Sequence, residues 1–149
     1  MRQAARLRDT LRMSQENVDL VRAVYDALNR GDWDAALVAP GFELDFSRAI
    51  GPGRGVYEGR DQLRRFLAEL GEGWESVRFE PHEFIEAGDL VVVPMTQHVK
   101  GRDGIEVSAS PTMVWTIRDG AIERAVMYQE REDALEAAGL SAQDAHADS

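Results

Sequence analysis

The clearest alternation of hydrophobic and polar positions along the chain lies between Pro111 and Glu130. It predicts two long antiparallel strands joined at Asp119-Gly120, a dipeptide that supplies the positive φ angles of a two-residue hairpin turn. Regular pairing across this turn predicts three sets of cross-strand neighbours: Ile117 with Ile122, Trp115 with Arg124, and Met113 with Val126.

One face of the predicted hairpin is mainly apolar but ends in two polar groups. The residues on this face are Met113, Trp115, Ile117, Ile122, Val126, Tyr128 and Glu130. An apolar sheet face that finishes in a phenol and a carboxylate has the composition of a pocket wall. Tyr128 and Glu130 are therefore candidate site residues, and the plainer interpretation of Glu130 is a strand end that emerges into water.

Upstream of the hairpin, apolar residues recur at helical spacing in three segments. They predict helices over residues 15–29, 32–37 and 61–70, with Tyr25 on the apolar stripe of the first and Trp33 as an anchor in the second. The plainer interpretation of Tyr25 is a core tyrosine, and the functional one is a hydroxyl that donates to a ligand. Trp33 is expected to line the core or a pocket.

A short strand is predicted over residues 42–46, where Phe42, Leu44 and Phe46 share one face and Asp45 lies on the other. If the apolar face packs on the helices, Asp45 is a surface residue. If the polar face lines a pocket, burial raises the Asp45 pKa towards that of a useful general base. The residues alone leave both interpretations open.

Glycine-containing turns divide the second half of the chain into four predicted strands, over residues 77–87, 90–100, 105–118 and 121–130. Pairing Gly101 with Ile105 places several residues on the face of Met113 and Trp115, and these are Val91, Val93, Met95, Gln97 and Val99. Thr96 and His98 are then on the reverse face. Met113, Trp115 and Gln97 become candidate ligand-binding residues.

Because helices precede an antiparallel meander rather than alternating with its strands, the predicted fold class is α+β. We expect a cone-shaped α+β barrel, in which the N-terminal helices pack on a strongly curved, mostly antiparallel sheet. The predicted organisation is a flexible extension over residues 1–13, a single domain over 14–140 and a disordered tail over 141–149.

Composition narrows the functional classes. The 149-residue chain has a formal net charge of -10 and no cysteine. Such acidity argues against nucleic acid or an anionic membrane as a partner, and the lack of cysteine excludes disulfides and thiolate chemistry. The three histidines lack metal-ligand spacing, and no serine lies in a nucleophile-elbow pattern. We therefore expect a cytoplasmic protein without a metal or other cofactor.

Three motifs resemble the nuclear transport factor 2-like superfamily, most closely its SnoaL-like branch. They lie at Val24–Trp33, Tyr57–Leu63 and Val114–Gly120, and the resemblance covers Ser14–Leu140. The superfamily includes steroid delta-isomerases, polyketide cyclases, epoxide hydrolases and non-catalytic assembly domains, so the resemblance implies a fold rather than one reaction.

The resemblance also implies roles for individual residues. Tyr25 is similar in place to the oxyanion-donating tyrosine of steroid isomerases, and Asp45 to their general base. Residues 107–112 hold no counterpart of their second, protonated aspartate. Glu130 stands where SnoaL-like cyclases carry an acid/base aspartate. Arg124, with Asp45 and Glu130, resembles the acid–arginine–acid network of limonene-epoxide hydrolases only weakly, because the spacing differs.

The resulting hypothesis is a small isomerase- or cyclase-type enzyme that performs acid/base chemistry on an apolar, carbonyl-bearing small molecule. Asp45 or Glu130 moves a proton, while Tyr25 or Tyr128 hydrogen-bonds the developing oxyanion. The alternatives are a hydrophobic-ligand-binding module and a pure association domain. A homodimer through the outer sheet face is expected, since relatives commonly pair there. An enzyme of this kind needs a carboxylate inside the cone that no cation neutralises, whereas a binding module needs only the apolar wall.

Overall fold

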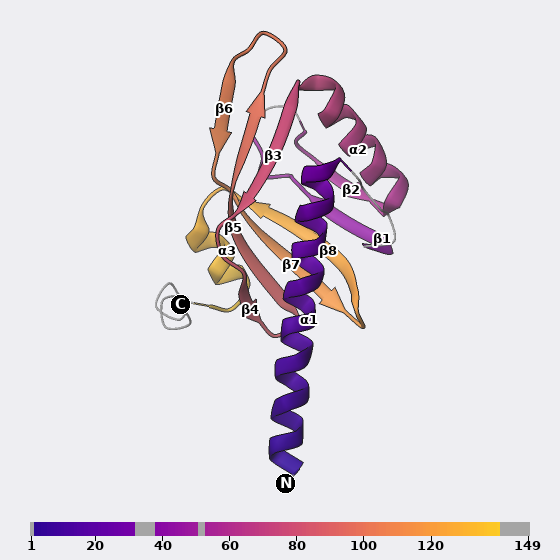
Figure 1. The fold of residues 1–149 in the computed structure, drawn as a ribbon, viewed down its shortest axis with the longest axis vertical. Helices are drawn as coiled ribbons and strands as arrows, with labels where there is room; N and C mark the ends of the chain where they lie inside the picture. The colour runs from indigo at the N-terminus through magenta and orange to yellow at the C-terminus, as the bar shows by residue number, and fades with distance from the viewer. Residues whose placement is uncertain (1, 32–37, 51–52, 141–149) are drawn as a thin grey trace.

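The computed structural model describes residues 2–31, 38–50 and 53–140, with side chains described from residue 15 onward. The described part contains three helices and eight strands (Figure 1). In chain order they are α1 (Arg2–Arg30), β1 (Val38–Asp45), β2 (Val56–Glu58), α2 (Gly59–Gly73), β3 (Ser76–Pro81), β4 (Ile85–Ala87), β5 (Leu90–Lys100), β6 (Glu106–Ala109), β7 (Thr112–Arg118), β8 (Ala121–Tyr128) and α3 (Arg131–Ala137).

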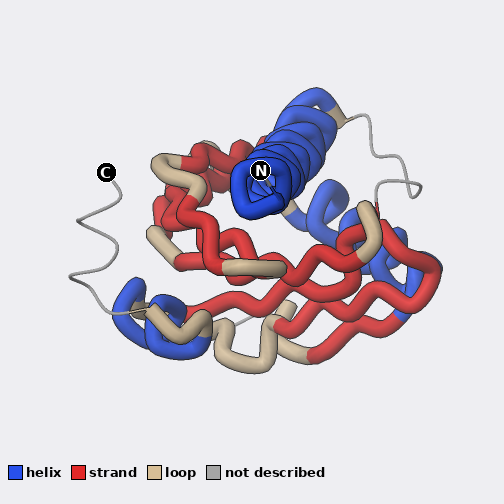
Figure 2. Tube along the Cα trace, turned by 90° about the horizontal axis from the view of Figure 1, so that it is seen from below, coloured by secondary structure: helices blue, strands red, loops and turns tan. Residues whose placement is uncertain are grey.

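The strands form one curved sheet in the order β2-β1-β8-β7-β5-β3, with β4 and β6 also paired to β5. All pairings are antiparallel except that of β1 with β8. Helices α1 and α2 lie on the concave side and α3 lies on the opposite side (Figure 2). The expected cone-shaped α+β fold is confirmed, although the sheet does not close into a barrel.

Helix α1 begins at Arg2 rather than near residue 15, so the predicted start of this helix is wrong. Its first half extends beyond the sheet (Figure 1). Its second half buries Val18, Val21 and Tyr25 against the sheet, which is the stripe that the helical spacing predicts. No helix in the described segments is both long and apolar enough to cross a membrane. The predicted helix over 32–37, with Trp33, and the tail over 141–149 lie outside the described residues.

Two of the predicted long strands are each divided in two. The segment predicted over 77–87 forms β3 and β4, and the segment over 105–118 forms β6 and β7. The reason lies in β5, whose first half pairs with β4 and β7 and whose second half pairs with β3 and β6. Pro81 and Pro111 stand at the two breaks, where a residue without a backbone N–H costs the ladder least.

The β7–β8 turn forms where predicted, and Asp119 and Gly120 have φ angles of 51° and 75°. The predicted register is correct only next to the turn, where Ile117 pairs with Ile122. A β-bulge at Glu123 then shifts the pairing, so that Trp115 faces Ala125 instead of Arg124. Two residues of β8 oppose one of β7 at such a bulge, and every later side chain changes face.

The bulge corrects the predicted faces of β8. Ala125 and Met127 join the concave core with Trp115, whereas Tyr128 packs on the other side of the sheet. The predicted pairing of Met113 with Val126 is also wrong, because Met113 pairs with Met127. Tyr128 therefore does not share the apolar face of Trp115.

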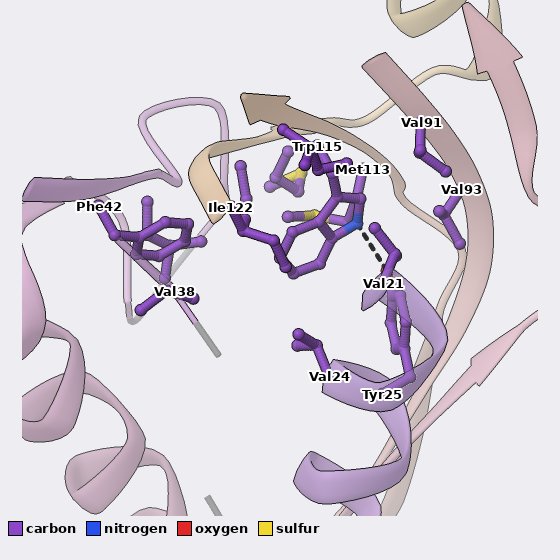
Figure 3. Packing of buried hydrophobic residues seen from close by; sticks show 14 of the residues in the cluster. Val21, Val24, Tyr25, Val38, Phe42, Val91, Val93, Met113, Trp115 and Ile122 are labelled. Atoms are coloured by element: carbon purple, nitrogen blue, oxygen red, sulfur yellow. Dashed lines mark hydrogen bonds between the residues drawn. The ribbon is translucent and has the colours of Figure 1, made fainter. Parts of the chain in front are cut away.

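The core on the concave side joins α1 and α2 to β1, β5, β7 and β8 (Figure 3). At its centre, the Trp115 indole N–H donates to the Tyr25 hydroxyl at 3.3 Å, and the two rings meet edge to face. A second cluster on the outer face packs Val114 beneath Ala134 and Leu135 of α3. Because α3 covers Val114, part of the face expected for a homodimer is occupied within the chain, and the dimer stays a prediction.

Candidate functional site

A large cavity among the described residues has a volume of about 550 Å³ and opens between α2, the turn after β1, the second half of β5 with β6, and the end of β8. Its lining residues are Phe46, Ala49, Ile50, Gly53, Phe66, Glu69, Leu70, Gly73, Trp74, Met95, Gln97, Val99, Val107, Ala109, Pro111, Met127 and Gln129. A mainly apolar cleft with a few polar groups is the usual composition of a small-molecule site.

Three polar side chains belong to this cavity wall. Gln129 donates from Nε2 to the Arg48 carbonyl oxygen at 2.8 Å, so part of its amide is already engaged. The side-chain amide of Gln97, in contrast, makes no hydrogen bond within the described part of the chain, which leaves its donor and its acceptor for a ligand. Glu69 is exposed on α2 and is the one carboxylate among the described lining residues.

Of the residues predicted from the sequence to bind a ligand, Gln97 lines this cavity. Met113 and Trp115 are buried in the core and border a smaller apolar cavity of about 60 Å³. Tyr25 borders that smaller cavity as well. Thr96 and His98 lie on the reverse face, as predicted, and His98 hydrogen-bonds Ser108 and Glu80 there.

The Tyr25 hydroxyl already makes two hydrogen bonds to other side chains of the protein. It donates to the Met95 sulfur at 3.3 Å and accepts from the Trp115 indole N–H. Burial raises the pKa of Tyr25 well above its ordinary value, and the Trp115 hydrogen bond only partly opposes this. These contacts match the plainer interpretation, a core tyrosine with satisfied partners.

Asp45 lies on the outer face of β1, opposite the core residue Leu44, and is 8% exposed. Its carboxylate accepts two hydrogen bonds from Ser47 and has Arg124 and Arg48 at 3.6 and 3.9 Å. Burial acts to raise the Asp45 pKa, but these hydrogen bonds and cations outweigh it and hold the pKa below its usual value. The geometry therefore matches an ionised structural carboxylate rather than a desolvated base.

Arg124 connects two carboxylates on the outer face. Its Nε lies 3.0 Å from Glu43, and its Nη2 lies 3.6 Å from Asp45. An acid–arginine–acid arrangement is thus present, but with Glu43 in the place suggested for Glu130. Glu130 itself is exposed at the start of α3. The nearby Tyr128 ring lies 4.6 Å from the Arg48 guanidinium carbon.

Sequence reasoning did not identify Phe46 and Phe66 as part of the aromatic wall of the large cavity. Phe46 directly follows β1, Phe66 belongs to α2 and Trp74 follows α2, and these segments meet only in the folded chain. The available signal was the apolar face of the predicted helix over 61–70. The described residues contain no group of three or more His, Asp or Glu side chains suited to hold a metal ion.

Comparison with known proteins identifies the fold family. The model of the SnoaL-like domain matches residues 21–125. No curated protein matches the chain significantly. Among solved structures, TerC co-crystallised with polyporic acid is 25% identical with a TM-score of 0.67, and the match covers 83% of this chain and 98% of TerC.

Two further structures are similar in fold. An NTF2-like protein of unknown function from Burkholderia pseudomallei K96243 is 23% identical with a TM-score of 0.66, over 81% of this chain and 95% of that one. SalBIII, an epoxide hydrolase/cyclase-like enzyme in pyran ring formation in the polyether salinomycin, is 18% identical with a TM-score of 0.64, over 78% and 92%. The family match spans most of the chain, and the chain therefore belongs to the SnoaL-like domain family.

Proposed function

We propose that the large cavity binds an apolar, ring-bearing small molecule that carries a carbonyl or hydroxyl group. The observation that carries this proposal is a cavity of about 550 Å³ whose wall includes Phe46, Phe66 and Trp74 together with the unengaged amide of Gln97. Aromatic rings on several sides favour a flat apolar ligand. The Gln97 amide can either donate to a carbonyl or accept from a hydroxyl, which orients such a ligand.

The comparison with TerC supports this ligand class. That protein was co-crystallised with polyporic acid, and nearly its whole length matches this chain. We extend the ligand class, rather than the compound, to the present cavity.

The second candidate is the cofactor-independent isomerase or cyclase expected from the sequence, in which Asp45 or Glu130 moves a proton. The SnoaL-like fold and cyclase-like neighbours such as SalBIII favour it. It has less support from the geometry, because Asp45 is held by two arginines on the outer face and Glu130 is exposed. Among the described lining residues, only the exposed Glu69 of α2 offers a carboxylate, so we place ligand binding first.

Binding is tested by titrating the protein with 1-aminoanthracene, a flat apolar probe, and with polyporic acid while the tryptophan fluorescence of the protein is followed. We expect saturable quenching by both probes. Replacing Gln97 by leucine is expected to weaken polyporic acid binding about five- to tenfold, because a hydrogen bond to the oxygen-bearing ligand is lost, and to leave 1-aminoanthracene within about twofold.

Gln15→Leu serves as the matched control, because Gln15 is exposed on α1 and its side chain hydrogen-bonds only Asp19 among the described residues. Its probe affinities should equal those of the wild type. Absence of saturable quenching by either probe would contradict the proposed function.

A further inference from the structure

The turn that follows β1 is built around the Asp45 carboxylate. Its Oδ1 accepts hydrogen bonds from the Ser47 backbone N–H at 2.9 Å and from the Ser47 hydroxyl at 2.6 Å. The Ala49 N–H donates to the Phe46 carbonyl oxygen at 3.0 Å, which closes the turn. A carboxylate bonded to the backbone two residues ahead restricts the local conformation. We propose that Asp45 is a positioning residue, which holds this turn in place as one wall of the apolar cavity.

The other carboxylate oxygen of Asp45 helps to join the turn to β8. Oδ2 lies 3.6 Å from Arg124 Nη2 and 3.9 Å from Arg48 Nη1. The Arg48 guanidinium in turn lies over the Tyr128 ring, and the Arg48 carbonyl accepts from the Gln129 side chain. The turn is therefore attached to the neighbouring strand by an ion pair, a ring contact and a hydrogen bond.

This turn matters for the cavity because Phe46, Ala49 and Ile50 all line it, whereas Asp45 does not. Asp45 thus acts on a ligand only through the position of these apolar side chains. The inference rests on the proposed function, since it assigns Asp45 to the wall of that same ligand site. It also gives the buried carboxylate a role other than the proton transfer expected from the family resemblance.

Charged groups around Asp45 determine how the turn responds to pH. Arg48 and Arg124 face its carboxylate, Glu43 shares Arg124, and Arg54 donates to the Ser47 carbonyl oxygen. Burial opposes ionisation of Asp45, but the net effect of its partners is a lowered folded-state pKa. A lowered carboxylate pKa stabilises the fold above the unfolded-state pKa, and this stabilisation is lost as the pH falls through the folded-state pKa. The turn should therefore loosen only in acid.

The test compares Asp45→Ala with Glu43→Ala in the full chain. Glu43 is the matched control, because it lies on the same face of β1 and pairs with the same Arg124, but among the described residues its side chain forms no hydrogen bond or ion pair with the turn. Two quantities are measured: the Kd for 1-aminoanthracene, and the amide hydrogen-exchange rate of Ala49. We expect Asp45→Ala to raise both about tenfold, and Glu43→Ala to leave both within about twofold.

Asp45→Asn keeps an oxygen that can accept from Ser47 but loses the charge, so its two values should lie between those of wild type and Asp45→Ala. Equal exchange rates and Kd values in Asp45→Ala and Glu43→Ala would overturn the proposal. If the wild type binds no probe, the proposed function is wrong. Faster Ala49 amide exchange in Asp45→Ala than in wild type would then still support the role of Asp45 in fixing the turn. If the wild type binds no probe and Ala49 exchange is also unchanged in Asp45→Ala, the proposed function and the proposed role of Asp45 are both wrong.

Discussion

Replacing Trp115 by alanine is expected to lower the free energy of unfolding by about 3–5 kcal/mol. Trp115 is 5% exposed at the centre of the concave core, where its ring packs edge to face on Tyr25. The substitution leaves a large void and also removes the indole N–H that donates to the Tyr25 hydroxyl. Since single domains are stable by only about 5–15 kcal/mol, such a loss is a large part of the total.

Urea unfolding followed by far-ultraviolet circular dichroism measures this loss. Trp74→Ala is the matched control, because Trp74 is only half-buried at the cavity wall and its removal should cost about 1 kcal/mol. A cost for Trp115→Ala no larger than that of the control would mean that the core is not organised around Trp115 and Tyr25.

Replacing Ala109 by tryptophan is expected to abolish binding of 1-aminoanthracene, with a loss of affinity of at least about a hundredfold, because the added ring occupies the volume that the ligand needs. Ala109 is an exposed residue of β6 whose side chain lines the large cavity. The indole should enter the cavity without displacing core residues, so the unfolding free energy should change by less than about 1 kcal/mol.

Glu106→Trp is the control for this variant. Glu106 is exposed on the same strand, is not among the residues that line the cavity, and pairs with Lys100 of β5. Fluorescence titration of both variants compares a tryptophan placed inside the cavity with one placed outside it. Retained probe binding in Ala109→Trp, with loss in Glu106→Trp, would locate the ligand site elsewhere.

The pairing of β8 shows which part of a strand register the local sequence pattern cannot predict. The turn at Asp119-Gly120 and the pair Ile117 with Ile122 followed from the residues alone. One extra residue at Glu123 then reversed every face beyond it, because side chains on a strand alternate with a period of two. The sequence signal for such a bulge is a pair of adjacent polar residues, Glu123 and Arg124, between the buried Ile122 and Ala125. The bulge keeps both polar side chains out of the core.

The Asp45 environment illustrates the same limit for the site. Alternation in β1 correctly separated Asp45 from Phe42 and Leu44, and left open which face meets a cavity. The position of Asp45 depends on the parallel pairing of β1 with β8. This pairing brings Arg124 beside Asp45 from a segment distant in sequence. Such pairings depend on the packing of the whole sheet rather than on neighbouring residues.

The amino-acid sequence by itself determined the α+β class, the SnoaL-like family, the buried stripe of α1, and the face of β5 that carries Gln97. These properties depend on local periodicity and on short motifs. Only the tertiary structure decided that the large cavity is walled by Phe46, Phe66 and Trp74, and that Asp45 and Tyr128 lie outside it. The physical reason is that a cavity wall and a carboxylate's partners are assembled from segments that meet only when the sheet curves.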